Sequence, residues 1–152
     1  VGEAPGKNEA ITGVPFCGRA GKILDALLQS VGIKREDIYI TNVVKDRPPK
    51  NRDPLPEEIA LYTPFFDRQI EIIKPKVIAT LGSFSMAYSM EKFGLSDALD
   101  SISRIHGKVF DARASYGTIK IITLYHPAAA IYNPSIREVM EKDFQILKNY
   151  KN

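Results

Sequence analysis

Apolar residues recur every three or four positions over residues 19–31, and Gly32 follows them. This spacing predicts a helix with one buried stripe, ending at a glycine that can adopt a left-handed conformation. The same spacing predicts helices over residues 56–73, from Gly82-Ser83 to about Phe93, and from Ser135 to the end of the chain. The last of these is expected to open with a capping box, because Glu138 follows Ser135 by three positions.

Short runs rich in β-branched residues predict buried strands over residues 38–44, 77–81 and 119–124, the last fed by a hairpin turn at residues 115–117. A proline-rich loop over residues 45–54 separates the first strand from the next helix. Strands that alternate with helices indicate a three-layer α/β/α fold with a central, mainly parallel sheet. We expect one domain over residues 1–152, preceded by a strand that the sequence omits.

The composition limits the partners and the cellular compartment that we expect for the protein. The 152 residues carry a net charge of +3, which favours a polyanionic partner only weakly. The single cysteine, Cys17, allows no intramolecular disulfide and no thiolate metal cage, so we expect a reducing, intracellular location. No apolar run approaches the roughly 20 residues that span a bilayer, and no signal segment opens the sequence, so no membrane association is expected.

Three unusual segments follow expected strands or precede expected helices. They are residues 2–6 with an extension to Phe16, Asn42 near the end of its strand, and His126 with the two residues after it. Ligands bind at the carboxyl ends of strands in open parallel sheets, so these segments are expected to converge on one site.

Five blocks of the sequence resemble family 4 uracil-DNA glycosylases, in the order and at about the spacing of that family. The blocks are GEAPG at residues 2–6, TGVPFCGRAGKILD at 12–25, YITNVVKDRPPKNRDP at 39–54, KPKVIATLG at 74–82 and TLYHPAA at 123–129. The resemblance implies the uracil-DNA glycosylase fold and a monofunctional repair enzyme. Such an enzyme hydrolyses the bond between uracil and deoxyribose in DNA and leaves an abasic site. It further implies a monomer in the prokaryotic cytoplasm, associated with the nucleoid.

The resemblance also implies how the base would be held. Phe16 resembles the aromatic platform that stacks on uracil, although a phenylalanine in this context is also compatible with a core position. Asn42 resembles the residue that reads the base edge, because an amide can donate to O4 and accept from the N3 hydrogen. A strand-end asparagine that caps a turn is the structural alternative. Gly2 and Ala4 are expected to line the same pocket.

Catalysis is expected to depend on Asn42, His126 and Glu3. His126 resembles the histidine beside uracil O2, where a donor stabilises the charge that develops on the departing base. Glu3 is the best candidate for positioning water or stabilising the cationic sugar. Glu9 is the alternative carboxylate, and both could instead be solvated loop charges.

Contacts to the DNA backbone need cations and free amide groups. The candidates are Arg19, Lys22, Lys45, Arg47, the helix start at Gly82 and Ser83, and the loop of Pro127 and Ala128, which would enter the minor groove. Lys50 and Arg52 are equally compatible with a solvated face.

The sequence departs from the family pattern at two positions. Most family members bind a [4Fe–4S] cluster through four cysteines, but Asp46 and Tyr62 occupy the positions of the middle pair. Neither side chain is a usual ligand for such a cluster, so we expect no metal and no cofactor. Packing of Tyr62 and three prolines is expected to hold the middle loop instead, and Cys17 is expected to serve small-residue packing.

Other interpretations remain open at this stage. His106 is expected to contact the DNA backbone or to be structural. A superfamily member that acts on mismatched thymine or a deaminated purine is one alternative function, and a non-catalytic DNA-binding relative is another. The spacing of Gly13 and Gly18 resembles a phosphate-binding loop, but Lys22 is followed by Ile23 and the required hydroxyl is absent.

Overall fold

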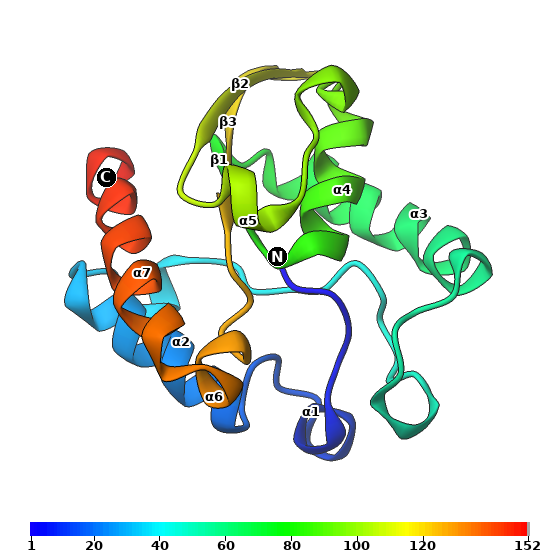
Figure 1. The fold of residues 1–152 in the computed structure, drawn as a ribbon. Helices are drawn as coiled ribbons and strands as arrows, with labels where there is room; N and C mark the ends of the chain where they lie inside the picture. The colour runs from blue at the N-terminus through cyan, green and yellow to red at the C-terminus, as the bar shows by residue number, and fades with distance from the viewer. Residues whose placement is uncertain (152) are drawn as a thin grey trace.

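The computed structural model describes residues 1–151 (Figure 1). Its sheet contains β1 (Val77–Leu81), β2 (Val109–Ala114) and β3 (Gly117–Leu124), in the order β1-β3-β2. Strands β1 and β3 are parallel and in register from Val77 opposite Lys120 to Leu81 opposite Leu124. Strand β2 is antiparallel to β3, as the expected hairpin requires.

The start of the chain extends this sheet. The Val1 carbonyl accepts a hydrogen bond from Leu81 N at 2.7 Å, and Gly2 forms a parallel bridge with Asn42. The predicted strand at residues 38–44 is therefore wrong, and the segment forms only an isolated bridge at Asn42. A strand needs a hydrogen-bonded neighbour, and the neighbouring segment, residues 1–3, reaches only residues 41–44. Tyr39 is consequently 58% exposed.

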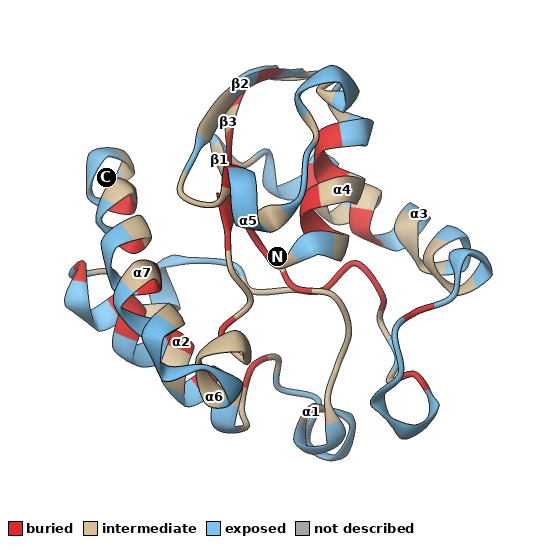
Figure 2. Cartoon of the chain, viewed as in Figure 1, coloured by how far each residue is buried: buried red, intermediate tan, exposed pale blue. Residues whose placement is uncertain are grey.

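Helices cover both faces of the sheet, which confirms the expected α/β architecture. Helices α2 (Arg19–Ser30) and α7 (Pro134–Phe144) pack on one face, and α3 (Pro56–Ile73), α4 (Ser83–Lys92) and α5 (Ile102–Ile105) pack on the other. Buried residues run along β1 and β3 and along the helix sides that face them (Figure 2). Two short helices, α1 (Lys7–Thr12) and α6 (Ala129–Tyr132), lie beyond the strand ends in Figure 1. Short 3₁₀-helices occupy Arg35–Asp37, Pro49–Asn51, Ser96–Ala98 and Gln145–Tyr150.

The structure corrects the expected start of α7. Asn133, not Ser135, caps this helix: its side chain accepts hydrogen bonds from the Ser135 amide at 3.2 Å and hydroxyl at 2.6 Å. Pro134 takes the first helical position, which its fixed φ favours. The expected capping box is therefore absent, because the cap lies two residues earlier than the sequence pattern indicated.

The proline-rich loop has two kinds of contact. Pro48 and Pro54 are buried and Tyr62 is partly buried, as packing of the loop requires, whereas Pro49 is exposed. Arg52 also donates two hydrogen bonds to Glu58, at 2.7 and 2.8 Å, and so ties the loop to the first turn of α3. Within residues 1–151, none of the helices is both long enough and apolar enough to span a membrane.

Candidate active site

The three segments singled out in the sequence meet beside the carboxyl ends of β1 and β3. The Gly2 amide donates to the Thr41 carbonyl at 2.9 Å, which places the first segment beside Asn42. The Gly82 amide donates to the Leu124 carbonyl at 2.9 Å, and Gly82 lies against the His126 side chain. Gly82 has a φ of +95°, so glycine suits this close approach on both conformational and steric grounds.

Asn42 and Phe16 both lie close to Gly2. A Cβ atom on Gly2 would come within 2.6 Å of Phe16 Cζ and closer still to Asn42 Oδ1. Both side chains are buried, each with 6% of its surface exposed. Asn42 Oδ1 has no hydrogen-bond partner among residues 1–151, an exceptional condition for a buried polar atom and a common one where a ligand completes the bonding.

The backbone of Phe16 is held in an unusual conformation. Its φ is +51°, in the left-handed region that non-glycine residues rarely adopt. Arg35 donates to the Phe16 carbonyl at 3.0 Å and to the Pro15 carbonyl, while Asp25 pairs with the same guanidinium at 2.8 Å. Gly21 of α2 lies so close to the Phe16 carbonyl that any side chain there would overlap it. Sequence analysis missed Arg35, because no local pattern links it to a carbonyl 19 residues earlier.

Glu9 is committed to the same loop. Its Oε1 accepts hydrogen bonds from the amides of Cys17 at 3.0 Å and Gly18 at 3.2 Å, immediately before α2. Burial alone would raise the pKa of Glu9, but backbone amides, including these two, hold it below its usual value. This arrangement favours a structural role for Glu9 over the water-activating one. Cys17 contacts the Thr12 hydroxyl at 3.3 Å.

His126 packs beside Phe16, with 5.6 Å between the ring centroids. Burial lowers the pKa of His126 to about 4. The imidazole is therefore neutral near pH 7. Its Nδ1 accepts a hydrogen bond from the Ala128 amide at 3.1 Å, so the single ring hydrogen lies on Nε2.

The pKa of Glu3 is shifted upward, whereas that of His126 is shifted downward. Burial raises the pKa of its carboxyl to about 7, and the Asp53 carboxylate adds to this effect. Glu3 is thus poised to change its charge near neutral pH, a property often found in residues that take part in catalysis. Its carbonyl accepts a hydrogen bond from the Val44 amide at 2.9 Å, which fixes the backbone at this point.

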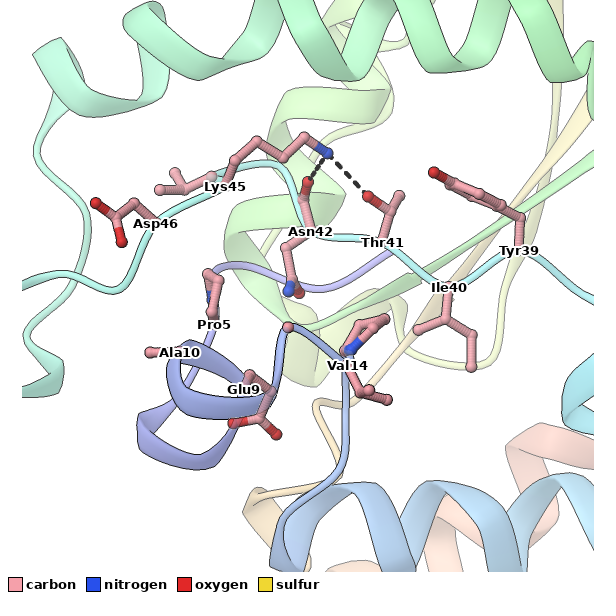
Figure 3. A pocket seen from close by; sticks show the side chains of 13 residues that line it. Pro5, Glu9, Ala10, Val14, Tyr39, Ile40, Thr41, Asn42, Lys45 and Asp46 are labelled. Carbon is pink, nitrogen blue, oxygen red and sulfur yellow. Dashed lines mark hydrogen bonds between the residues drawn. The ribbon is translucent and has the colours of Figure 1, made fainter.

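A cavity of about 380 Å³ opens beside Asn42 (Figure 3). Pro5, Val14 and Pro15 line it from the first loop, and Thr41, Asn42 and Lys45 line it from the facing segment. Phe16 and His126 are not part of the cavity wall. Phe16 lies beside Gly2, as Asn42 does, and His126 packs against Phe16. Ala4 is partly buried next to Pro5.

Lys45 is not placed as we expected for a DNA contact. Its ammonium group turns into the protein and bonds to Thr41 Oγ1 at 2.8 Å and to the Asn42 carbonyl (Figure 3). It also donates to Gln69 Oε1 of α3 at 2.6 Å. The other cations lie nearer the surface: Arg19 and Lys22 are exposed at the start of α2, and Arg47 is partly buried and bonds to Asn51 at 2.6 Å.

The structure also changes the expected DNA contacts at Gly82 and Ser83 and at Pro127 and Ala128. Because the Gly82 amide is bonded to Leu124, it is not free for phosphate, whereas Ser83 is exposed at the first position of α4. Pro127 is buried and Ala128 is partly buried, so Pro127 does not project from the loop as a wedge would.

The residues present do not fit an iron-sulfur cluster. Such a cluster is held by thiolates, and Cys17 is the one cysteine of the sequence. Asp46 and Tyr62 offer only oxygen ligands. Throughout residues 1–151, no group of three or more His, Cys, Asp or Glu side chains is placed to hold a metal ion.

His106 lies in a structural cluster apart from these residues. Its Nδ1 lies 2.7 Å from Asp143 Oδ2 of α7, and its ring packs on Tyr125 at 4.8 Å between centroids. This contact joins the end of α5 to α7, in agreement with the structural alternative for this histidine.

The fold and the site together define a class of protein. A family model described as the uracil DNA glycosylase superfamily matches residues 1–148. A type-4 uracil-DNA glycosylase of Archaeoglobus fulgidus is 48% identical over 145 residues, which cover 95% of this chain and 72% of the relative. Relatives of the same description are 47% identical in Saccharolobus solfataricus, covering 97% of this chain and 68% of the relative, and 41% identical in Thermotoga maritima, covering 99% and 75%. The chain belongs to the uracil-DNA glycosylase superfamily and, within it, to the type-4 family.

Proposed function

We propose that the protein removes uracil from DNA by hydrolysing the bond between uracil N1 and deoxyribose C1′, which releases the base and leaves an abasic site. The observation that carries this proposal, beyond family membership, is the unpartnered and buried Asn42 Oδ1 beside Gly2 and Phe16. An acceptor in this state requires a donor, and the N3 hydrogen of uracil supplies one.

Recognition begins with extrusion of the nucleotide from the helix, because the enzyme cannot reach the bond within stacked DNA. Phe16 stacks on the extruded base, while Gly2 and Ala4 leave room for it. Asn42 accepts from N3 and donates to O4. Cytosine presents the reverse pattern there, so each unpaired group would disfavour it by about 1–3 kcal/mol.

Bond cleavage leaves the electron pair of the broken bond on uracil and a cation on the sugar. His126 donates its Nε2 hydrogen to uracil O2 and stabilises the negative charge as it develops. Because its pKa is about 4, the group acts as a neutral donor and transfers no proton.

Glu3 acts on the other half of the reaction. Its ionised carboxylate stabilises the cationic sugar and orients the water that adds to C1′. The proton lost by that water passes to Glu3 or to the uracil anion, so no covalent enzyme intermediate is required. The fraction of enzyme with ionised Glu3 rises as the pH passes the pKa of about 7.

The DNA backbone is bound by the exposed cations Arg19 and Lys22, by the partly buried Arg47 and by the amide of Ser83, with the segment of Pro127 and Ala128 facing the minor groove. We further propose that the enzyme acts as a monomer, without an iron-sulfur cluster, on prokaryotic nucleoid DNA. A sedimentation experiment tests the monomeric state, and iron analysis of the purified protein tests the absence of a cluster.

A labelled oligonucleotide that contains one uracil tests the main proposal. The wild type is expected to produce alkali-sensitive sites at the uracil, and a matched oligonucleotide with cytosine is expected to remain intact. Asn42→Ala and His126→Ala should each lower the cleavage rate at least about a hundredfold. Tight DNA binding without cleavage would favour the non-catalytic alternative, and cleavage only at mismatched thymine or a deaminated purine would favour the other lesions.

A further inference from the structure

Lys45 is a cation bonded to neutral groups only. Its ammonium has three hydrogens, and three oxygens accept them: Thr41 Oγ1, the Asn42 carbonyl and Gln69 Oε1. The charge also lies 5.4 Å from the centre of the Phe66 ring. Throughout the part of the chain described, no carboxylate forms an ion pair with Lys45.

These bonds fix the segment that carries Asn42. Thr41 precedes Asn42, Lys45 follows it by three residues, and Gln69 belongs to α3, so the ammonium ties both sides of Asn42 to a long helix. Because the Asn42 carbonyl itself is held, the backbone from which the Asn42 side chain projects cannot rotate freely. Burial lowers the pKa of Lys45 to about 8, which is consistent with a charge enclosed by the protein rather than solvated.

We propose that Lys45 is a positioning residue that holds Asn42 in the orientation needed to read uracil, and that it does not contact DNA phosphate. This inference rests on the proposed function. A displacement of about 1 Å at a reacting group can lower a rate a hundredfold, so loss of the Lys45 bonds should lower the cleavage rate while DNA affinity is retained.

Lys45→Met tests the proposal, because methionine fills similar space without a charge or a donor. Lys92→Met on α4 is the matched control: Lys92 also lies near an aromatic ring, at 5.6 Å from Phe93, and pairs with Asp67 at 3.2 Å, away from the site. We expect Lys45→Met to lower the single-turnover cleavage rate at least about tenfold, with DNA affinity unchanged within about twofold. Lys92→Met should retain the wild-type rate.

A double-mutant cycle with Asn42→Ala separates positioning from a general structural role. If Lys45 acts through Asn42, adding Lys45→Met to Asn42→Ala should change the remaining rate by less than about twofold. An equal loss in both backgrounds overturns the proposal. Gln69→Leu is the second variant, to be used if Lys45→Met does not fold. It removes one acceptor and leaves Lys45 in place. Its rate loss should be smaller, and it should likewise disappear in the Asn42→Ala background.

The same proteins test the phosphate contact that the sequence suggested. If Lys45 neutralised a phosphate, Lys45→Met would weaken DNA binding and reduce the salt slope of log affinity by about 1, with the rate at saturation unchanged. That result overturns the proposal. A wild type that does not cleave uracil-containing DNA refutes the proposed function, whereas a wild type and a Lys45→Met protein that cleave equally refute only this inference.

Discussion

Replacement of Gly2 by alanine should disable the site with only a moderate loss of stability. The added Cβ would lie 2.6 Å from Phe16 Cζ and closer to Asn42 Oδ1, whereas ordinary contacts begin at about 3.4 Å. Each side chain would therefore have to move by about 1 Å, enough to lower the rate of a well-oriented reaction by about a hundredfold. Overpacking of this kind costs about 1–3 kcal/mol of stability.

Gly94→Ala provides a control of similar stability cost. Gly94 has a φ of +74°, so alanine there is strained, but no atom lies within 4 Å of the added Cβ. Its cost of about 1 kcal/mol should leave the cleavage rate unchanged. Single-turnover cleavage of a uracil-containing oligonucleotide, measured beside thermal unfolding of both variants, compares the two effects. If Gly2→Ala cleaves at the wild-type rate, the proposed arrangement of Asn42 and Phe16 is refuted.

Three further predictions concern charged groups. The single-turnover rate should rise about tenfold per pH unit below pH 7 and level off above it, because the Glu3 carboxyl, with a pKa of about 7, must lose its proton. Glu3→Gln should show a low rate without this rise. A flat wild-type profile contradicts the role assigned to Glu3. Because folding lowers the pKa of His126 from 6.5 to about 4, the unfolded chain binds the extra proton, and the free energy of unfolding should fall by about 3 kcal/mol as the pH drops from 6.5 to 4. His126→Gln should lose less stability than the wild type in acid denaturation, and equal losses refute this cause. Arg35→Ala should lower the free energy of unfolding by about 2 kcal/mol and slow cleavage, because it releases the Phe16 carbonyl. Lys34→Ala should change neither the stability nor the rate. An Arg35→Ala enzyme with wild-type stability and rate would show that the bonds from Arg35 to the Phe16 loop are unimportant.

The elements that sequence analysis located well are those with a local signal. The apolar stripe of α2 and the β-branched run of β1 were predicted within a residue of their observed bounds, because burial of one helix face or a whole strand imposes a period on the sequence. The segment at residues 38–44 carried the same strand signal but lacks a neighbour beside residues 38–40. Pairing is a property of the fold, so the sequence of one segment cannot show it.

In the candidate site, the identities of the main residues could be predicted from the sequence, but the direction of a charged side chain could not. Phe16, Asn42 and His126 were identified from a resemblance that extends over the chain. In the structure Phe16 and Asn42 lie beside Gly2, and His126 packs against Phe16. The inward direction of Lys45 was missed, because a lysine in a basic, proline-rich loop has the same local signature whether it faces solvent or a glutamine 24 residues away.

The residues that sequence analysis misjudged share a physical role. Arg35 bonds to backbone carbonyls beside the aromatic ring, Lys45 bonds to the carbonyl of Asn42, and Glu9 bonds to the amides that precede α2. Each is a charged side chain that holds the backbone of a functional residue or of the loop next to it. A charged hydrogen bond is stronger than a neutral one, so it can fix a loop that has no strand partner of its own. Several charges around the site are thus used to hold it in shape, and counting the cations in the motif overstates the number available to bind DNA.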